Sequence, residues 1–142
     1  MSGLSAFFSQ NALKAENEKY VVSKRFLDED KNPMEWEIQA ITEAVNEALR
    51  KECTRKVPVP GKKNMFQSEM NHDKYLGKLA ARCTVYPNLN DAELQNSYGI
   101  MGADELLKEM LTSGEYANYL EKVQETNGFD TTTQDLVEQA KN

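Results

Sequence analysis

The pattern of hydrophobic and polar positions predicts helices along much of the chain. Apolar residues recur every three or four positions in five stretches, at about residues 42–54, 71–84, 91–99, 103–111 and 113–127. This spacing is typical of helices that bury one face. Stop signals such as Pro87, Gly99 and the Asn127-Gly128 pair separate the stretches. Polar residues mark helix starts: Thr42 and Ser113 suit the N-cap position, and Asn90 can begin a capping box with Glu93.

Residues 20–41 have a different pattern, which predicts a β-hairpin. The first arm, YVVSKRFL, is rich in β-forming residues, DEDKNP supplies a turn, and the second arm is MEWEIQAI. Alternation in the second arm puts Trp36 and Ile38 on one face, as in a strand with one buried side, so we expect Trp36 in the core. An isolated hairpin is barely stable in water. The predicted fold is therefore α+β and mostly α-helical, with one β-hairpin packed on a bundle of about five or six helices.

The stretch RKVPVPGKK, at residues 55–63, predicts a loop. Pro58 and Pro60 exclude a helix there, and the glycine favours a turn. The stretch holds four basic residues and no acidic one. Such a loop could contact an acidic partner or nucleic acid, although four cations are a weak signal.

Short apolar clusters lie near both ends of the chain. Leu4, Phe7 and Phe8 have the spacing of one or two helical turns. Leu136 and Val137 belong to a segment too short for a stable isolated helix. Two interpretations stay open for both clusters, namely docking on the core and binding of a partner. These five residues are the candidate partner-binding residues.

The length of the chain indicates its domain organisation, and the distribution of its charge indicates which partners to expect. With 142 residues it can bury a real core, and we expect residues 1–130 to form a single globular domain with residues 131–142 loosely attached. The net charge of −6 is uneven, because residues 91–142 carry three basic and eleven acidic side chains. An acidic half repels phosphates, so we expect no nucleic-acid partner there.

The sequence contains few candidates for catalytic or metal-binding residues. Cys53 and Cys83 belong to no CxxC pair and the chain has one histidine, so we expect no metal site and two cysteines that act as small core hydrophobes. The motifs GxGxxG, GxSxG and HExxH do not occur. His72 has no nucleophile beside it in the sequence and reads as a surface residue. We therefore expect no catalytic residues, no cofactor and no enzymatic activity.

The sequence also argues against a signal peptide and against a membrane-spanning segment. No basic segment is followed by a long apolar run near the N-terminus, and no apolar run approaches the roughly 18 residues that a membrane span needs. We expect a cytoplasmic protein without a membrane partner.

Several runs of residues resemble a known family. The most specific are YPNLNDAELQNSYG and GEYANYLEKVQETNGFD, and RKVPVPGKK and the Phe7-Phe8 pair extend the similarity over most of the chain. They resemble the XkdN-like family of phage tail assembly chaperones, which occurs in contractile-tailed phages and PBSX-type prophages of Gram-positive bacteria. The resemblance implies a non-enzymatic protein of the host bacterial cytoplasm. It would bind the phage tape measure protein, keep it soluble, and leave before the virion is complete.

The resemblance also implies a second form of the protein, because many members are made in two lengths through a ribosomal frameshift. Lys141-Asn142 can be encoded by AAA-AAC, which suits such a site, so a longer form of the chain itself is a further expected partner. Two other functions stay open. One is a structural virion component, such as a minor tail or connector subunit, and the other is an acidic regulator that sequesters a basic partner.

Overall fold

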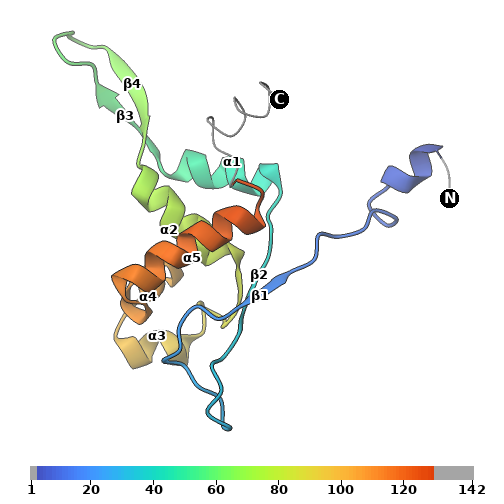
Figure 1. The fold of residues 1–142 in the computed structure, drawn as a ribbon. Helices are drawn as coiled ribbons and strands as arrows, with labels where there is room; N and C mark the ends of the chain where they lie inside the picture. The colour runs from blue at the N-terminus through green and yellow to red at the C-terminus, as the bar shows by residue number, and fades with distance from the viewer. Residues whose placement is uncertain (1–2, 130–142) are drawn as a thin grey trace, which may run out of the picture.

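The structure, a computed structural model, describes residues 3–129 and combines α-helices with two small β-sheets (Figure 1). In chain order the elements are the 3₁₀ helix η1 (Gly3–Phe7), β1 (Glu18–Tyr20), β2 (Trp36–Ile38), α1 (Glu43–Glu52), β3 (Thr54–Pro58), β4 (Phe66–Met70), α2 (His72–Cys83), β5 (Thr84–Tyr86), α3 (Ala92–Tyr98), α4 (Ala103–Met110) and α5 (Ser113–Thr126). The five helices predicted from periodicity are confirmed as α1 to α5.

Side-chain caps explain where the helices begin. Thr42 caps α1 as predicted, by accepting a hydrogen bond from the Val45 amide. Two predicted caps are wrong by one residue. Asp91 rather than Asn90 caps α3. Thr112 rather than Ser113 caps α5, where it forms a complete capping box with Glu115.

The hydrophobic core lies where α2, α4 and α5 meet the buried face of β2. Trp36 is buried, as predicted, and its ring centroid lies 5.2 Å from that of Tyr119 in an edge-to-face contact. Both cysteines are buried, which confirms their expected place in the core. The buried apolar residues form one cluster: Val22, Trp36, Ile38, Cys53, Tyr75, Leu79, Ala80, Cys83, Leu89, Leu106, Leu107, Met110, Leu111, Tyr119 and Val123.

The prediction of one hairpin at residues 20–41 packed on a helical bundle is wrong. β1 and β2 do pair antiparallel, with Tyr20 opposite Trp36, but β5 pairs along the other side of β2, so the sheet has three strands in the order β1-β2-β5. Between β1 and β2 the backbone is irregular apart from a bridge between Leu27 and Pro33. The Asp28 carboxylate accepts hydrogen bonds from backbone amides two and four residues on, which holds this segment as a loop instead of strands.

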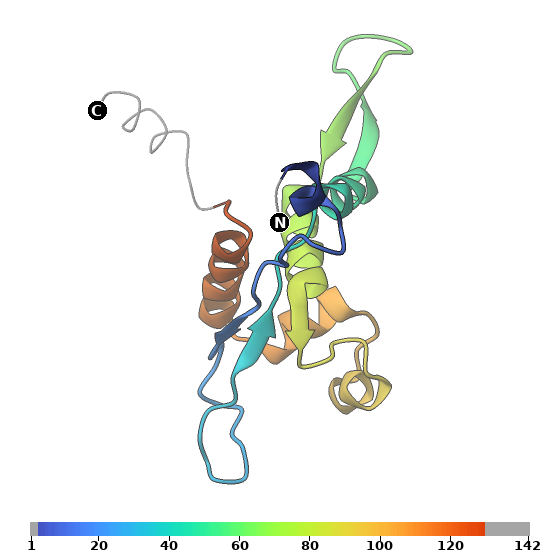
Figure 2. The same cartoon turned by 90° about the vertical axis from the view of Figure 1, so that its right-hand side faces the viewer.

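A second correction concerns the predicted loop at residues 55–63. β3 and β4 form a hairpin whose register runs from Thr54 opposite Met70 to Pro58 opposite Phe66. Pro58 stands at the end of its strand and Pro60 lies in the turn, where a missing amide breaks no ladder. The hairpin stands clear of the helices in two perpendicular views (Figures 1 and 2).

The expected loosely attached segment, residues 131–142, lies outside the described residues, and so do Leu136 and Val137. Within residues 3–129, none of the helices is long and apolar enough to cross a membrane. The same residues contain no group of three or more histidine, cysteine or acidic side chains placed to hold a metal ion.

Candidate partner-binding surfaces

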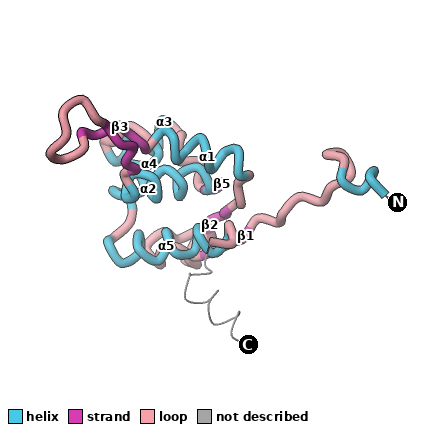
Figure 3. The backbone as a smooth tube through the Cα atoms, turned by 90° about the horizontal axis from the view of Figure 1, so that it is seen from above, coloured by secondary structure: helices cyan, strands magenta, loops and turns pink. Residues whose placement is uncertain are grey.

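The N-terminal arm, defined here as residues 3–17, extends away from the body of the protein and carries η1 near its far end (Figures 1 and 3). Leu4 and Phe7 are 72% and 80% exposed, and Phe8 and Leu13 are exposed as well. No residue of η1 is buried. The predicted helical turn is therefore present as a 3₁₀ helix, and its apolar side chains do not dock on the core.

Local hydrogen bonds give the far end of the arm a defined shape. The Asn11 side-chain amide donates to the Ser5 carbonyl at 2.8 Å, and the backbone amides of Asn11 and Ala12 both donate to the Phe8 carbonyl at 2.9 Å. These bonds fold the chain back after η1. The arm thus presents Phe7 and Phe8 on a short ordered turn, which lowers the entropy lost when a partner covers them.

The arm is fixed to the body at its base. β1 pairs with β2 there, and Lys122 of α5 binds the Glu18 carboxylate at 2.7 Å. The nearby carboxylate raises the pKa of Lys122 above its ordinary value. The same ammonium lies 5.6 Å from the ring centroid of Tyr20, in reach of a cation–π contact. Strand pairing, the Lys122 ammonium and a hydrogen bond from the Asn17 side chain to the Glu37 carboxylate at 3.3 Å therefore hold the base of the arm, while its far end extends away from the body.

A small apolar hollow opens on the body beside the three-stranded sheet. Its volume is about 130 Å³, close to the roughly 150 Å³ of an apolar cavity that accommodates benzene. The hollow is lined by Phe26, Met34, Trp36, Tyr86, Pro87 and Met110. It has room for one apolar side chain of a partner.

Two side-chain amides inside the body have structural roles. Asn46 is buried and accepts a hydrogen bond from the Tyr75 hydroxyl. The Asn127 side chain accepts from the Ile41 amide at 2.9 Å and donates to the Val123 carbonyl at 2.8 Å, which ties the end of α5 to the segment after β2. Burial raises the pKa of the Cys83 thiol, which keeps it protonated and unreactive at neutral pH. His72 is exposed, as predicted.

The structure brings three of the five candidate residues together. Leu4, Phe7 and Phe8 lie within one short stretch of the arm and all face solvent. Sequence reasoning missed Leu13, which is 98% exposed on the same arm and stands isolated in a polar stretch. It also missed the apolar hollow, because the residues that line it come from three separate parts of the chain.

Comparison with known proteins places the chain in a family. The chain is 36% identical over 140 residues to protein YqbN of Bacillus subtilis (strain 168), an alignment that covers 98% of this chain and 93% of YqbN. Over the same length it is 33% identical to the phage-like element PBSX protein XkdN of that strain, with the same coverage. The crystal structure of YqbN superposes with a TM-score of 0.75 at 31% identity and covers 92% of this chain and 99% of the YqbN chain. Residues 4–141 match the family model of the phage XkdN-like tail assembly chaperones, and the chain belongs to this family.

Proposed function

We propose that this protein binds the phage tape measure protein and keeps it soluble until the tail is assembled. Membership of the tail assembly chaperone family, a non-enzymatic kind of protein, implies a phage tail protein as partner. The observation that carries the finer proposal is the N-terminal arm, whose apolar side chains face solvent. Exposed apolar clusters of this kind mark interaction sites on proteins that otherwise bury such residues.

A tape measure protein is an appropriate partner for such an arm. A long helical protein exposes apolar stripes until its assembly partners cover them, and those stripes recur at helical spacing. Phe7 and Phe8 on the arm would pack against one such stripe, and an apolar side chain of the client would enter the hollow beside Trp36. The arm and the hollow would together cover apolar surface that otherwise drives aggregation.

The expected affinity suits a reversible helper. Burial of a leucine or phenylalanine side chain contributes about 1.5–3 kcal/mol. Much of the gain from three such side chains is offset by the loss of translational freedom and by the ordering of the arm. With so small a net binding free energy, the chaperone would release the tape measure protein when that protein is built into the tail.

Further parts of the proposal rest on the sequence. Leu136 and Val137 would add a second apolar contact near the other end of the chain. The excess of acidic side chains in residues 91–142 would keep a chaperone–client complex dispersed. We place this action in the host cytoplasm and assign the protein no catalytic role.

Co-expression with the tape measure protein encoded by the same phage tests the proposal. The measurement is the fraction of the client that stays in solution and co-purifies, with the client expressed alone as reference. We expect the chain to raise that fraction severalfold and Phe7→Ser to remove most of the increase. Leu27→Ser is the matched control, because Leu27 is an exposed apolar residue on the loop between β1 and β2. Equal losses in both variants would contradict a role for the arm.

Purified phage particles give an independent test. A chaperone leaves before the virion is complete, so mass spectrometry of particles should not detect this chain. Its presence in stoichiometric amounts would instead show a structural virion component.

A further inference from the structure

The β3–β4 hairpin uses few of its side chains in the fold. Of the strand residues only Val57 and Met70 are partly buried, and Met65 and Phe66 next to the turn are exposed, Phe66 by 63%. Two perpendicular views show the hairpin projecting from one end of the protein, with α3 near the other end (Figures 1 and 2). The faces of the hairpin are therefore open to a partner.

The charge of this hairpin is opposite to that of the whole chain. Residues 54–70 carry four basic side chains and one acidic one, a net charge of +3, while the whole chain has −6. Ion pairs are found elsewhere in residues 3–129, but none of them involves the four basic residues: Arg55, Lys56, Lys62 and Lys63. The hairpin therefore presents uncompensated positive charge, which attracts polyanions.

The register of the two strands places basic and aromatic side chains on one face. Opposed residues share a face and successive residues alternate between faces, so Lys56 lies on the same face as Phe66, as its diagonal neighbour. The one acidic residue of the hairpin, Glu69, is opposite Arg55 and lies on the other face. We call the first side the Phe66 face, and its strand residues are Thr54, Lys56, Pro58, Phe66, Ser68 and Met70.

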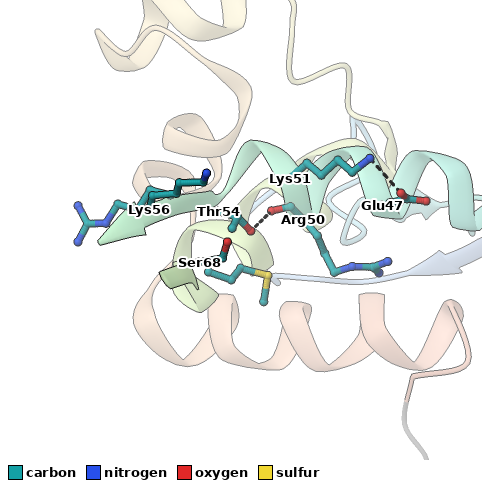
Figure 4. Close-up of a pocket in the computed structure, with 8 residues that line it drawn as sticks. Glu47, Arg50, Lys51, Thr54, Lys56 and Ser68 are labelled. Atoms are coloured by element: carbon teal, nitrogen blue, oxygen red, sulfur yellow. Dashed lines mark hydrogen bonds and ion pairs between the residues drawn. The ribbon is translucent and has the colours of Figure 1, made fainter. Parts of the chain in front are cut away.

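A hollow at the base of the hairpin continues the Phe66 face toward α1 (Figure 4). Its volume is about 450 Å³, and the Phe66 face contributes Thr54, Lys56, Ser68 and Met70 to its lining. Arg50 and Lys51 at the end of α1 add two cations, which are paired with acidic residues of the same helix. An elongated ligand on this face would meet cations at the base, the Phe66 ring farther out, and the two lysines of the turn beyond it.

The acidic body does not cancel this attraction at physiological salt. Residues 91–129 carry eight acidic and two basic side chains, so the excess of negative charge lies on the body. The ladder of five residue pairs is about 17 Å long at about 3.4 Å per residue. This length is about twice the Debye length at physiological salt, so the field of the body is largely screened at the turn. The repulsion expected for residues 91–142 therefore does not extend to the hairpin.

We propose that the Phe66 face of the hairpin binds single-stranded nucleic acid. The cations would contact phosphates along the strand, and an unpaired base would stack on the Phe66 ring, the combination by which proteins bind single strands without sequence preference. A duplex hides the faces of its bases, and an acidic peptide has no bases, so an exposed aromatic ring among cations favours a single strand. This inference goes beyond the proposed function and does not depend on it, because the N-terminal arm is a separate surface.

Fluorescence anisotropy with labelled oligonucleotides and the full chain tests the contact. The probes are oligo(U) and oligo(dT) of about 12 nucleotides, which is within the usual range of single-strand sites. With four phosphate contacts, we expect the Kd to rise about 50-fold between about 50 mM and about 200 mM salt. Tighter binding of oligo(U) would identify RNA as the ligand through contacts to its 2′-hydroxyl groups, and equal binding would show a site that accepts RNA and DNA alike. No binding of either probe at low salt, or tighter binding of labelled duplex DNA or polyglutamate, would overturn the proposal.

Two variants separate the charge contacts from the stacking contact. Lys62→Glu/Lys63→Glu should weaken binding about tenfold or more and reduce the salt dependence by about half, because two of four phosphate contacts are lost. Phe66→Ala should weaken binding about fivefold or more and leave the salt dependence as it is, because stacking releases no counterions.

Each variant has a matched control at an exposed position away from the hairpin. Lys24→Glu/Lys31→Glu makes the same change in net charge on the loop between β1 and β2, and Phe129→Ala removes an exposed phenylalanine that follows α5. Both controls should bind like the original chain, and circular dichroism would confirm that every variant is folded. Equal weakening in a variant and its control would overturn the proposal.

Discussion

Arg25 and Glu115 join two segments that lie far apart in the chain. The Arg25 guanidinium lies 2.6 Å from one Glu115 oxygen and 3.3 Å from the other, and it also donates to the Met110 carbonyl at 2.8 Å. The loop between β1 and β2 is thereby fixed to the start of α5. Hydrogen bonds from Arg25, Ser23 and the Thr112 backbone lower the pKa of Glu115 from 4.5 to about 2.

This pair predicts a pH dependence of stability. Because the folded protein lowers the pKa of Glu115, its contribution is fully present above pH 4.5 and is lost as the pH falls toward 2. Glu115→Gln should be less stable than the original chain at pH 7, and the difference should shrink between pH 4.5 and 2. Urea unfolding at several pH values measures it. Other carboxylates titrate in both proteins and cancel, so a difference independent of pH would contradict the assignment.

A hydrogen bond between two hydroxyl groups, those of Tyr119 and Thr84, predicts a modest contribution to stability. Tyr119 Oη and Thr84 Oγ1 lie 2.6 Å apart, and Thr84 also donates to the Ala80 carbonyl. Tyr119→Phe removes the first bond and leaves Thr84 with the second, so it should cost about 1 kcal/mol of unfolding free energy. Trp36→Ala in the same cluster should cost about 3–5 kcal/mol, because it leaves a cavity. Denaturant unfolding of both variants should give this order.

Among the elements, those with local signals could be predicted and those that depend on tertiary pairing could not. Periodic apolar positions predicted α1 to α5, since a helix makes its own hydrogen bonds. β5 has three residues and follows α2 directly, and only its pairing with β2 makes it a strand. The β3–β4 hairpin was missed because two prolines suggested a loop, although a two-stranded hairpin tolerates proline at its edge.

The candidate partner-binding residues show the same difference between local signals and tertiary arrangement. The sequence indicated Leu4, Phe7 and Phe8 as an apolar cluster but left core docking and partner binding open. Whether these side chains are exposed depends on how the arm lies relative to the body of the protein. Two features of the basic hairpin could not be predicted. Its two segments pair as strands, and the helices leave these strands exposed. The spacing of residues in the sequence predicts neither this pairing nor this exposure.

The hairpin also yields a prediction at the scale of elements. Because its strands bury little, an Asn-Gly turn in place of residues 57–67 should change the unfolding free energy of the body by less than about 1 kcal/mol. Lys56 and Ser68 lie opposite each other in the register, so a two-residue turn can join them. Thermal and denaturant unfolding of the shortened protein measure this difference. A large loss of stability would mean that the hairpin belongs to the core.

At the scale of the whole molecule, two projecting surfaces of different chemistry leave the body in different directions. The N-terminal arm is apolar, and the β3–β4 hairpin is basic with a few apolar residues (Figures 1 and 3). Neither contributes a fully buried side chain to the core. Since the core does not depend on their side chains, the two surfaces can make contacts independently of each other.

That independence leads to the last prediction. Removal of residues 1–13 should abolish capture of the tape measure protein, while thermal stability stays as in the full chain, because β1 and its ion pair with Lys122 remain. Lys62→Glu/Lys63→Glu, on the exposed β3–β4 hairpin, should leave both capture and thermal stability unchanged. If the hairpin change also abolished capture, the arm and the hairpin would both belong to the client-binding site.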